Sequence, residues 1–118
     1  MIFFEESGVS FGSFPRDDFY KIEHSKGHKS LGNGFKMVEF TYLKNQKMFM
    51  VEAKSSIPNP RNTSDYENYW NEIFEKFENA LPLQMMGCLK QNSIVEQELP
   101  SNHKLIDWQK ATIQLRLI

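Results

Sequence analysis

The chain has 118 residues, a length that suits one domain with a single hydrophobic core and needs no disulfide or metal to hold it together. Apolar residues make up 40% of the sequence and charged residues 25%, which excludes a disordered chain. The formal net charge of −1 argues against a protein that binds nucleic acid through overall charge alone.

The single cysteine, Cys88, excludes an intrachain disulfide, and its apolar neighbours predict a buried, unreactive thiol. No stretch reaches the roughly 18 consecutive apolar residues of a membrane-spanning helix. The N-terminal sequence MIFFEESG lacks the positive charge with which a signal peptide begins. We therefore expect a reducing, cytoplasmic location and no membrane partner.

The first third of the chain contains short apolar pieces separated by turn residues. Residues 1–15 are interrupted by glycine and proline, which predicts an extended lead-in. Asp17 or Asp18 predicts the start of a short helix through DFYKIEHSK, with Gly27 as its end. The residues that follow, GHKSLGNG, are typical of a loop.

The middle of the chain predicts two strands and a long helix. Residues 35–43 and 47–54 are rich in Val, Phe, Tyr and Met and nearly alternate, which predicts two adjacent strands. Ser64 precedes Glu67 by three residues, a capping-box spacing, and aromatic and aliphatic residues then recur at helical intervals and are expected in the core. Pro82 is expected to break or kink this helix.

The C-terminal part predicts a loop and a strand. Residues 90–104 are polar and typical of a loop, and the closing sequence ATIQLRLI alternates as a strand does. The chain ends on an apolar residue within this strand, which leaves open whether the natural polypeptide extends further.

Charge is unevenly distributed along the chain. Residues 16–54 carry eight basic and five acidic side chains, a net +3, whereas residues 63–99 carry seven acids and two lysines, a net −5. A basic hairpin region beside an acidic helix is compatible with phosphate contact and equally with a solvated surface of mixed sign.

The two strands carry charged residues where apolar pairs would hold a hairpin together better. A turn centred on residues 45 and 46, or a four-residue loop over 44–47, places Glu39 directly opposite Glu52. A loop of three or five residues would shift this register. Because side chains alternate along a strand, Glu39, Glu52 and Lys54 are expected on one face.

Two carboxylates that face each other on a hairpin repel, by about 0.2–1 kcal/mol even in water. A divalent cation between Glu39 and Glu52 would turn this repulsion into attraction, since carboxylate oxygens are preferred ligands of Mg²⁺ and Mn²⁺. The alternative is an open, solvated sheet face on which Glu52 pairs with a nearby lysine.

Glu39, a twelve-residue gap and the tripeptide E-A-K at 52–54 on the next strand resemble the signature of the PD-(D/E)XK nuclease superfamily, the restriction-endonuclease-like fold. The predicted order over residues 16–81, a short helix, two strands and a long helix, followed by a C-terminal strand, is also similar to that superfamily. The string VEAKSSIPNP resembles small bacterial proteins of uncharacterised function.

The resemblance implies metal-dependent hydrolysis of phosphodiester bonds, in which the ion acts as a Lewis acid and helps to generate the nucleophile. It implies that Glu39 and Glu52 hold Mg²⁺ or Mn²⁺ and that Glu23, on the preceding helix, completes or supports the metal shell. It implies further that Lys54 orients the attacking water or stabilises developing negative charge.

These patterns predict one α/β domain over residues 1–118, with a central mixed sheet flanked by helices. The leading functional hypothesis is a metal-dependent nuclease or an inactive descendant of one. The alternative is a noncatalytic protein-interaction module, on which the charges serve solubility or partner choice. A nucleic-acid partner would require lysines such as Lys36 and Lys47 to receive the phosphate backbone. A homodimer is left open.

Overall fold

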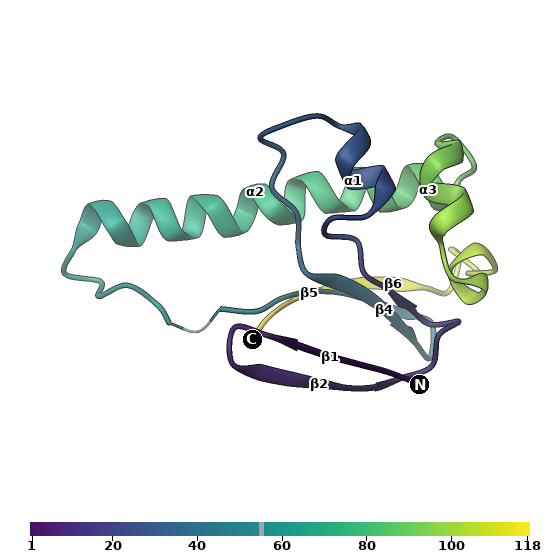
Figure 1. Ribbon diagram of the computed structural model, residues 1–118, viewed down its shortest axis with the longest axis horizontal. Coiled ribbons are helices and arrows are strands. Elements are labelled where there is room, and N and C mark those ends of the chain that lie inside the picture. Colours follow the sequence, from purple (N-terminus) through teal and green to yellow (C-terminus); the bar gives the residue numbers. More distant parts are fainter. Residues whose placement is uncertain (55) are drawn as a thin grey trace.

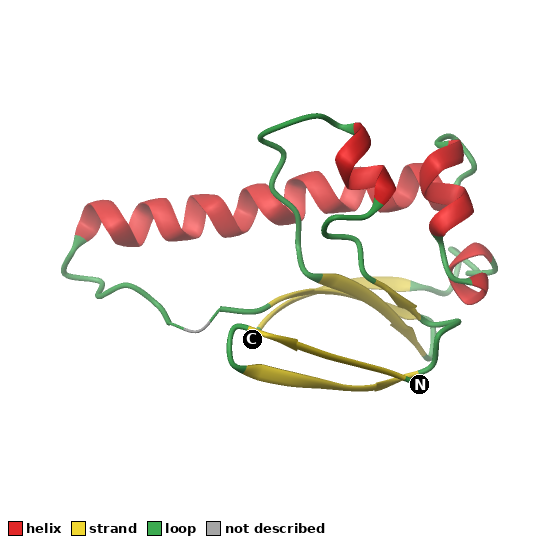
Figure 2. Ribbon diagram, in the orientation of Figure 1, coloured by secondary structure: helices red, strands yellow, loops and turns green. Residues whose placement is uncertain are grey.

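The structure is a computed structural model that describes residues 1–54 and 56–118. In chain order its elements are β1 (Ile2–Glu6), β2 (Val9–Phe14), β3 (Phe19–Tyr20), α1 (Lys26–Ser30), β4 (Phe40–Lys44), β5 (Lys47–Glu52), α2 (Thr63–Cys88), α3 (Ser93–Glu98), the 3-10 helix η1 (Ser101–Lys104) and β6 (Thr112–Leu117). They form three layers, with the helices on one face of a central sheet and the β1–β2 hairpin on the other (Figures 1 and 2).

The central sheet has four strands in the order β3-β4-β5-β6. Strands β3, β4 and β5 are antiparallel neighbours, whereas β6 runs parallel to β5. The chain reaches β6 through α2, because parallel neighbours require a long crossover connection. The predicted mixed sheet in an α/β chain is therefore confirmed.

The β4–β5 hairpin has the predicted register, but β4 begins at Phe40 and not at residue 35, so the expected pairing of Glu39 with Glu52 lies outside the ladder. Lys44 pairs with Lys47 and Phe40 pairs with Val51. The two turn residues between the strands, Asn45 and Gln46, have φ angles of 52° and 62°, which is the left-handed conformation of a tight hairpin turn.

One face of the sheet packs against the N-terminal hairpin. Phe40 lies between aromatic rings of β1 and β2, with ring centroids 5.6 Å from Phe4 and 5.1 Å from Phe11. The lead-in is extended as expected, but it turns back at Ser7 and Gly8 (φ 52° and 76°), so it forms a two-stranded layer. This hairpin covers the sheet face that a helix was expected to cover.

The other face carries the main hydrophobic core, which the three α-helices cover. Its buried members come from five segments of the chain: Tyr20, Ile22, Met37, Val38, Met50, Ile73, Phe77, Ala80, Leu83, Val95 and Leu99. None of the helices in the described part of the chain is long and apolar enough to cross a membrane.

The prediction of a short helix that starts at Asp17 or Asp18 is wrong. Phe19 and Tyr20 form strand β3, because they bury their side chains on opposite faces of the sheet, one in each core. Helix α1 begins later, at Lys26, and Gly27 lies inside it. A Cβ on Gly27 would lie 2.5 Å from Val95 Cγ2, so this glycine allows α1 and α3 to approach closely.

Helix α2 continues through Pro82, which was expected to break or kink it. Pro82 is exposed, whereas Phe77, Leu83 and Gln84 on either side of it are buried. Burial of the core-facing residues outweighs the lost helical hydrogen bond. The N-terminal half of α2 extends beyond the sheet (Figure 1).

Residues 90–104, which were expected to be a loop, contain α3 and η1. Asn92 caps α3, since its side-chain oxygen accepts hydrogen bonds from the N–H groups of Ile94 and Val95, both at 3.1 Å. Val95 and Leu99 then enter the core. His103 of η1 is also buried and contacts Gln84 of α2, so three buried side chains anchor this otherwise polar segment.

Candidate functional site

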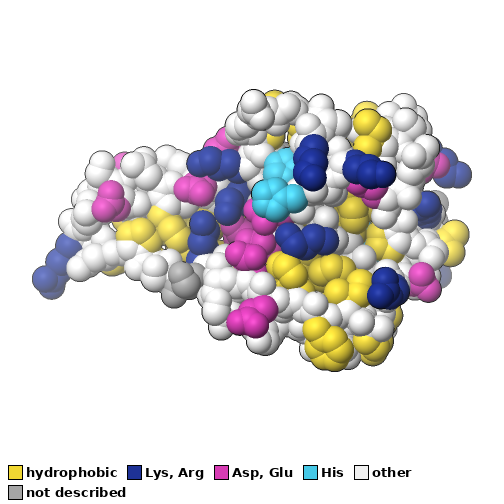
Figure 3. All heavy atoms as spheres, in the orientation of Figure 1, with side chains coloured by type: hydrophobic (Ala, Val, Ile, Leu, Met, Phe, Trp, Pro, Cys, Tyr) yellow, Lys and Arg dark blue, Asp and Glu magenta, His cyan; other side chains and the backbone are white. Residues whose placement is uncertain are grey.

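Ionisable side chains gather where β4 begins and β5 ends, beside α2. Figure 3 shows acidic, basic and histidine side chains together in the middle of one face of the molecule. Glu39 and Glu52 are buried there, with 5% and 0% of their surface exposed. Carboxylates are rarely buried so fully unless they are paired, protonated or bound to a cation.

The backbone bends at Glu39, immediately before β4. The N–H group of Glu39 donates a hydrogen bond of 3.0 Å to the carbonyl of Val51, and regular pairing begins with Phe40 and Val51. Val38, expected on the face opposite Glu39, lies in the core on the helical face because of this bend. Glu39 is therefore held at the end of the hairpin, where alternation is interrupted.

Glu39 and Glu23 lie together. Lys21 Nζ is 3.5 Å from a carboxylate oxygen of Glu23 and 3.9 Å from one of Glu39. Burial raises the pKa of Glu39 to about 8, and a hydrogen bond with Glu23 and the negative charges of Glu23 and Glu52 add to the rise. A pKa raised to about 8 favours the protonated form of Glu39 at neutral pH. Lys21 and Glu23 come from the segment between β3 and α1, which lies beside Glu39.

Glu52 has a different partner, Lys76 of α2. Lys76 Nζ donates a hydrogen bond to Glu52 Oε2, and only 12% of the Lys76 side chain is exposed. Burial acts to lower the pKa of Lys76, but the hydrogen bond and the charge of Glu52 outweigh it and raise that pKa. Lys76 therefore keeps its positive charge beside the buried Glu52 carboxylate.

Three buried polar atoms at the site have no hydrogen-bond partner within the described residues: Glu39 Oε2, Glu52 Oε1 and Tyr69 Oη. Burial, followed by the negative charge of Glu52, raises the pKa of Tyr69, which places its hydroxyl within electrostatic range of that carboxylate. Buried polar atoms without a partner are costly, and each is a candidate position for a bound ion or water.

Lys54 of the E-A-K tripeptide lies at the edge of the site, with 27% of its side chain exposed. Its Nζ is 3.9 Å from a carboxylate oxygen of Glu72, on α2. The other carboxylate oxygen of Glu72 is 3.7 Å from Lys36 Nζ. Glu72 therefore lies between two lysines that come from different segments of the chain.

The residues fit a hard divalent cation in part. Glu39 and Glu52 each have a buried oxygen without a hydrogen-bond partner, although that of Glu39 is 3.9 Å from Lys21 Nζ, and the charge of Glu52 contributes to the raised pKa of Glu39. Among the described residues, no group of three or more His, Cys, Asp or Glu side chains is arranged to hold a metal. Mg²⁺ commonly takes one or two carboxylates and completes its shell with water and substrate phosphate.

The sequence analysis did not identify Lys21, Tyr69, Glu72 or Lys76. A signal for Lys76 is present in the spacing, because it lies between Ile73, Phe77 and Ala80 on the buried side of α2, where a lysine needs a counter-ion. Lys47 is at the opposite end of β5 from Glu52, roughly 17 Å away along the strand, so it does not lie at this site.

The sequence matches no family model, and no significant match to a curated protein or to a solved structure was found.

Proposed function

We propose that the chain is a metal-dependent nuclease, similar to the PD-(D/E)XK superfamily, that hydrolyses phosphodiester bonds with Mg²⁺ or Mn²⁺. The observation that carries the proposal is a pair of buried carboxylates, Glu39 immediately before β4 and Glu52 at the end of β5, each with one oxygen that has no hydrogen-bond partner among the described residues. Glu39 and Glu52 would hold a divalent cation, whose charge would favour the ionised form of Glu39.

The arrangement of the strands also supports the proposal. An antiparallel pair carries Glu39 at the start of one strand and Glu52 at the end of the other, and a long helix then leads to a parallel strand. This is the order that the resemblance implies for a restriction-endonuclease-like fold. The helix expected to supply Glu23 is replaced by the turn after β3, from which Glu23 still reaches Glu39.

In this proposal Glu39 and Glu52 hold the cation, and Glu23 supports Glu39 by hydrogen bonding. When bound, the cation would polarise a phosphoryl oxygen and lower the pKa of a water molecule. Lys54, two residues after Glu52 and 3.9 Å from Glu72, would stabilise the negative charge that develops on phosphoryl oxygens. The water oxygen would bond to phosphorus and lose a proton to solvent, the bond from phosphorus to the leaving oxygen would break with its electron pair going to that oxygen, and the leaving oxygen would take up a proton from solvent.

Cleavage of a panel of single-stranded and double-stranded DNA and RNA, with Mg²⁺, Mn²⁺ or EDTA, tests the proposal. We expect metal-dependent cleavage that falls at least about 100-fold in Glu52→Gln and in Lys54→Ala. Lys47→Ala removes the same charge at the far end of β5 and should retain activity. Wild-type cleavage no faster than that of Glu52→Gln, with both proteins folded by circular dichroism, would contradict the proposal.

The alternative, a noncatalytic interaction module, is favoured by the free edge of β6. No strand of the described chain pairs with that edge, and Leu115 is 54% exposed on it. Antiparallel pairing with β6 of a second copy about Leu115 would place Ile113 opposite Leu117 and Gln114 opposite Arg116, which is self-complementary.

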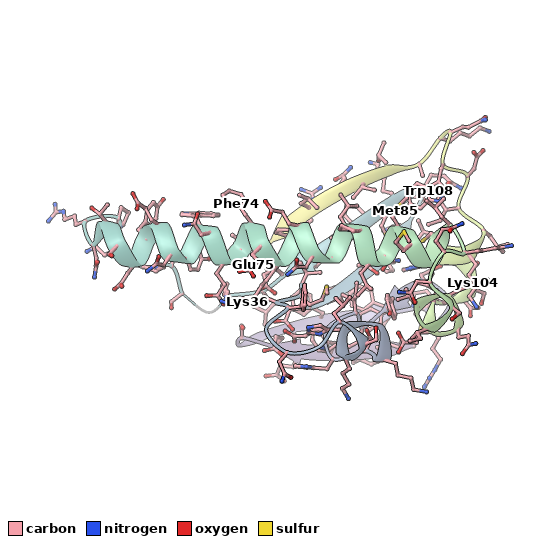
Figure 4. All side chains as sticks on the ribbon, turned by 90° about the horizontal axis from the view of Figure 1, so that it is seen from above. Lys36, Phe74, Glu75, Met85, Lys104 and Trp108 are labelled. Atoms are coloured by element: carbon pink, nitrogen blue, oxygen red, sulfur yellow. The ribbon has the colours of Figure 1, made fainter. Side chains whose placement is uncertain are left out.

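The same flank of the molecule exposes further apolar side chains. Phe74 of α2 is 57% exposed and lies on the same side of the helix as Met85 and Trp108 (Figure 4). Sedimentation equilibrium tests the homodimer. A dimer that dissociates in Leu115→Lys would support the module, and a monomer at all concentrations would contradict it.

We also propose a reducing, cytoplasmic location. Burial raises the pKa of the Cys88 thiol to about 11, so this cysteine stays protonated and unreactive at neutral pH.

A further inference from the structure

Glu72 occupies an unusual position at the rim of the carboxylate site. Its two carboxylate oxygens are 3.7 Å from Lys36 Nζ and 3.9 Å from Lys54 Nζ. The three side chains come from the loop before β4, the end of β5 and the middle of α2, and they are 47%, 27% and 40% exposed. A carboxylate held between two accessible lysines resembles, in charge and in acceptor oxygens, a phosphate held between them.

The backbone holds both lysines in place. The side chain of Asn79 on α2 donates a hydrogen bond of 2.9 Å to the carbonyl of Lys36, and the next residue, Met37, is buried. The N–H group of Lys54 donates a hydrogen bond of 2.9 Å to the carbonyl of Ile118. The fold therefore fixes the backbone positions of both lysines without Glu72.

We propose that Lys36 and Lys54 form a clamp for one phosphodiester group of a nucleic-acid strand, and that Glu72 occupies this clamp until the strand displaces it. In the proposed nuclease, this clamp would be the contact with the substrate backbone, and the inference rests on that function. Lys36 and Glu75 lie on the flank of α2 opposite Phe74, so the clamp is separate from the apolar flank (Figure 4).

The exchange of Glu72 for phosphate is energetically reasonable. Both contacts of Glu72 are longer than a hydrogen bond and partly exposed, and such ion pairs contribute little to stability. A nucleic-acid strand that binds through several phosphates also gains binding free energy from the release of its counterions. Nearby, Lys76 neutralises Glu52, so the site does not strongly repel an anion.

Binding of fluorescein-labelled DNA, measured by anisotropy in EDTA over a range of NaCl concentrations, tests the clamp without cleavage. Glu72→Gln should bind about 5-fold more tightly than wild type, because the competing carboxylate is removed. Lys36→Gln should bind about 5-fold more weakly. The slope of its log affinity against log salt concentration should fall by about 1, the amount expected for one lost phosphate contact. In the double variant the gain from Glu72→Gln should be lost.

Glu67→Gln and Lys47→Gln are the matched controls, because each makes the same charge change at an exposed position away from the clamp. Equal affinities for Glu72→Gln and Glu67→Gln, or for Lys36→Gln and Lys47→Gln, would overturn the clamp even if the protein cleaves DNA. The predicted changes in binding without any metal-dependent cleavage would support the clamp and contradict the nuclease.

Discussion

Glu52 and Lys76 form an ion pair in the interior of the protein, between the end of β5 and the buried side of α2. The Glu52 side chain is completely shielded from solvent, and the Lys76 side chain is 12% exposed. Transfer of both charges from water is costly, and their mutual attraction offsets that cost only while both are present. The pair therefore fixes the position of α2 over the carboxylate site.

Replacing one member of this pair should destabilise the protein strongly. Lys76→Met keeps the length of the side chain but leaves the charge of Glu52 buried without a partner, and should lower the free energy of unfolding by about 3 kcal/mol. Urea denaturation followed by circular dichroism measures the change.

The double variant Glu52→Gln/Lys76→Met is the control for this ion pair, because it removes both charges. It should be more stable than Lys76→Met alone. A loss below about 1 kcal/mol in Lys76→Met would show that the pair is solvated and not buried.

Local pattern accounted for much of the fold. The alternation of residues 35–43 and 47–54 and their short turn predicted the β4–β5 hairpin and its register, because turn length and side-chain alternation are local properties. The sequence patterns did not predict β3, since two residues are too few for a periodic signal. Strand β3 exists because Phe19 and Tyr20 meet two separate cores formed by distant segments.

The sequence patterns identified the residues of the candidate site near the two strands but not those on helix α2. The sequence identified Glu39, Glu52 and Lys54, because they interrupt apolar strands. The counter-ions Lys76 and Glu72 lie in a helix rich in charged residues, where a core-facing lysine differs little in pattern from an exposed one. Which carboxylate receives which counter-ion depends on how α2 packs across the sheet, and no local pattern encodes that.

The protonation of Glu39 predicts an unusual dependence of stability on pH. Burial and the neighbouring carboxylates raise the pKa of Glu39 from 4.5 to about 8 in the folded protein. Between these values the folded state binds more protons than the unfolded state, so this group makes stability fall as pH rises. Glu39→Gln cannot ionise and should be more stable than wild type at pH 8, by on the order of 4 kcal/mol.

Thermal or urea denaturation from pH 5 to pH 9 measures this difference. Glu67→Gln is the control, since it removes an exposed carboxylate from α2. The curve of Glu67→Gln should run parallel to that of wild type, whereas the curve of Glu39→Gln should diverge above pH 5. Parallel curves for all three proteins would mean that Glu39 is ionised in the folded state.

Metal binding should release a proton if Glu39 is a ligand. A divalent cation binds the ionised carboxylate, so at pH 7 the proton of Glu39 must leave. Affinity for Mn²⁺ should therefore rise from pH 6 to pH 8. Isothermal titration calorimetry in two buffers with different ionisation enthalpies counts the released protons, and Glu39→Gln should abolish the release. An equal heat of binding in both buffers would contradict Glu39 as a ligand.

A buried histidine should remain neutral in mildly acidic solution. His103 is completely buried, and burial lowers its pKa from 6.5. Gln84 accepts a hydrogen bond from the Thr41 hydroxyl (3.2 Å), so its amide nitrogen donates to His103 Nδ1 (3.0 Å). His103 Nε2 is consequently protonated and donates to the carbonyl of Asp18 (2.6 Å).

Nitrogen-15 NMR of the imidazole ring tests this assignment directly. His103 should show an unprotonated Nδ1 and a protonated Nε2, and should stay neutral as the pH falls below 6.5. Since the unfolded chain binds a proton there and the folded chain does not, this group makes stability fall as pH decreases below 6.5. Gln84→Met should cost about 1–3 kcal/mol, because it leaves His103 Nδ1 and the Thr41 hydroxyl unpaired in the interior. A His103 resonance that titrates at or above pH 6.5 would contradict the buried network.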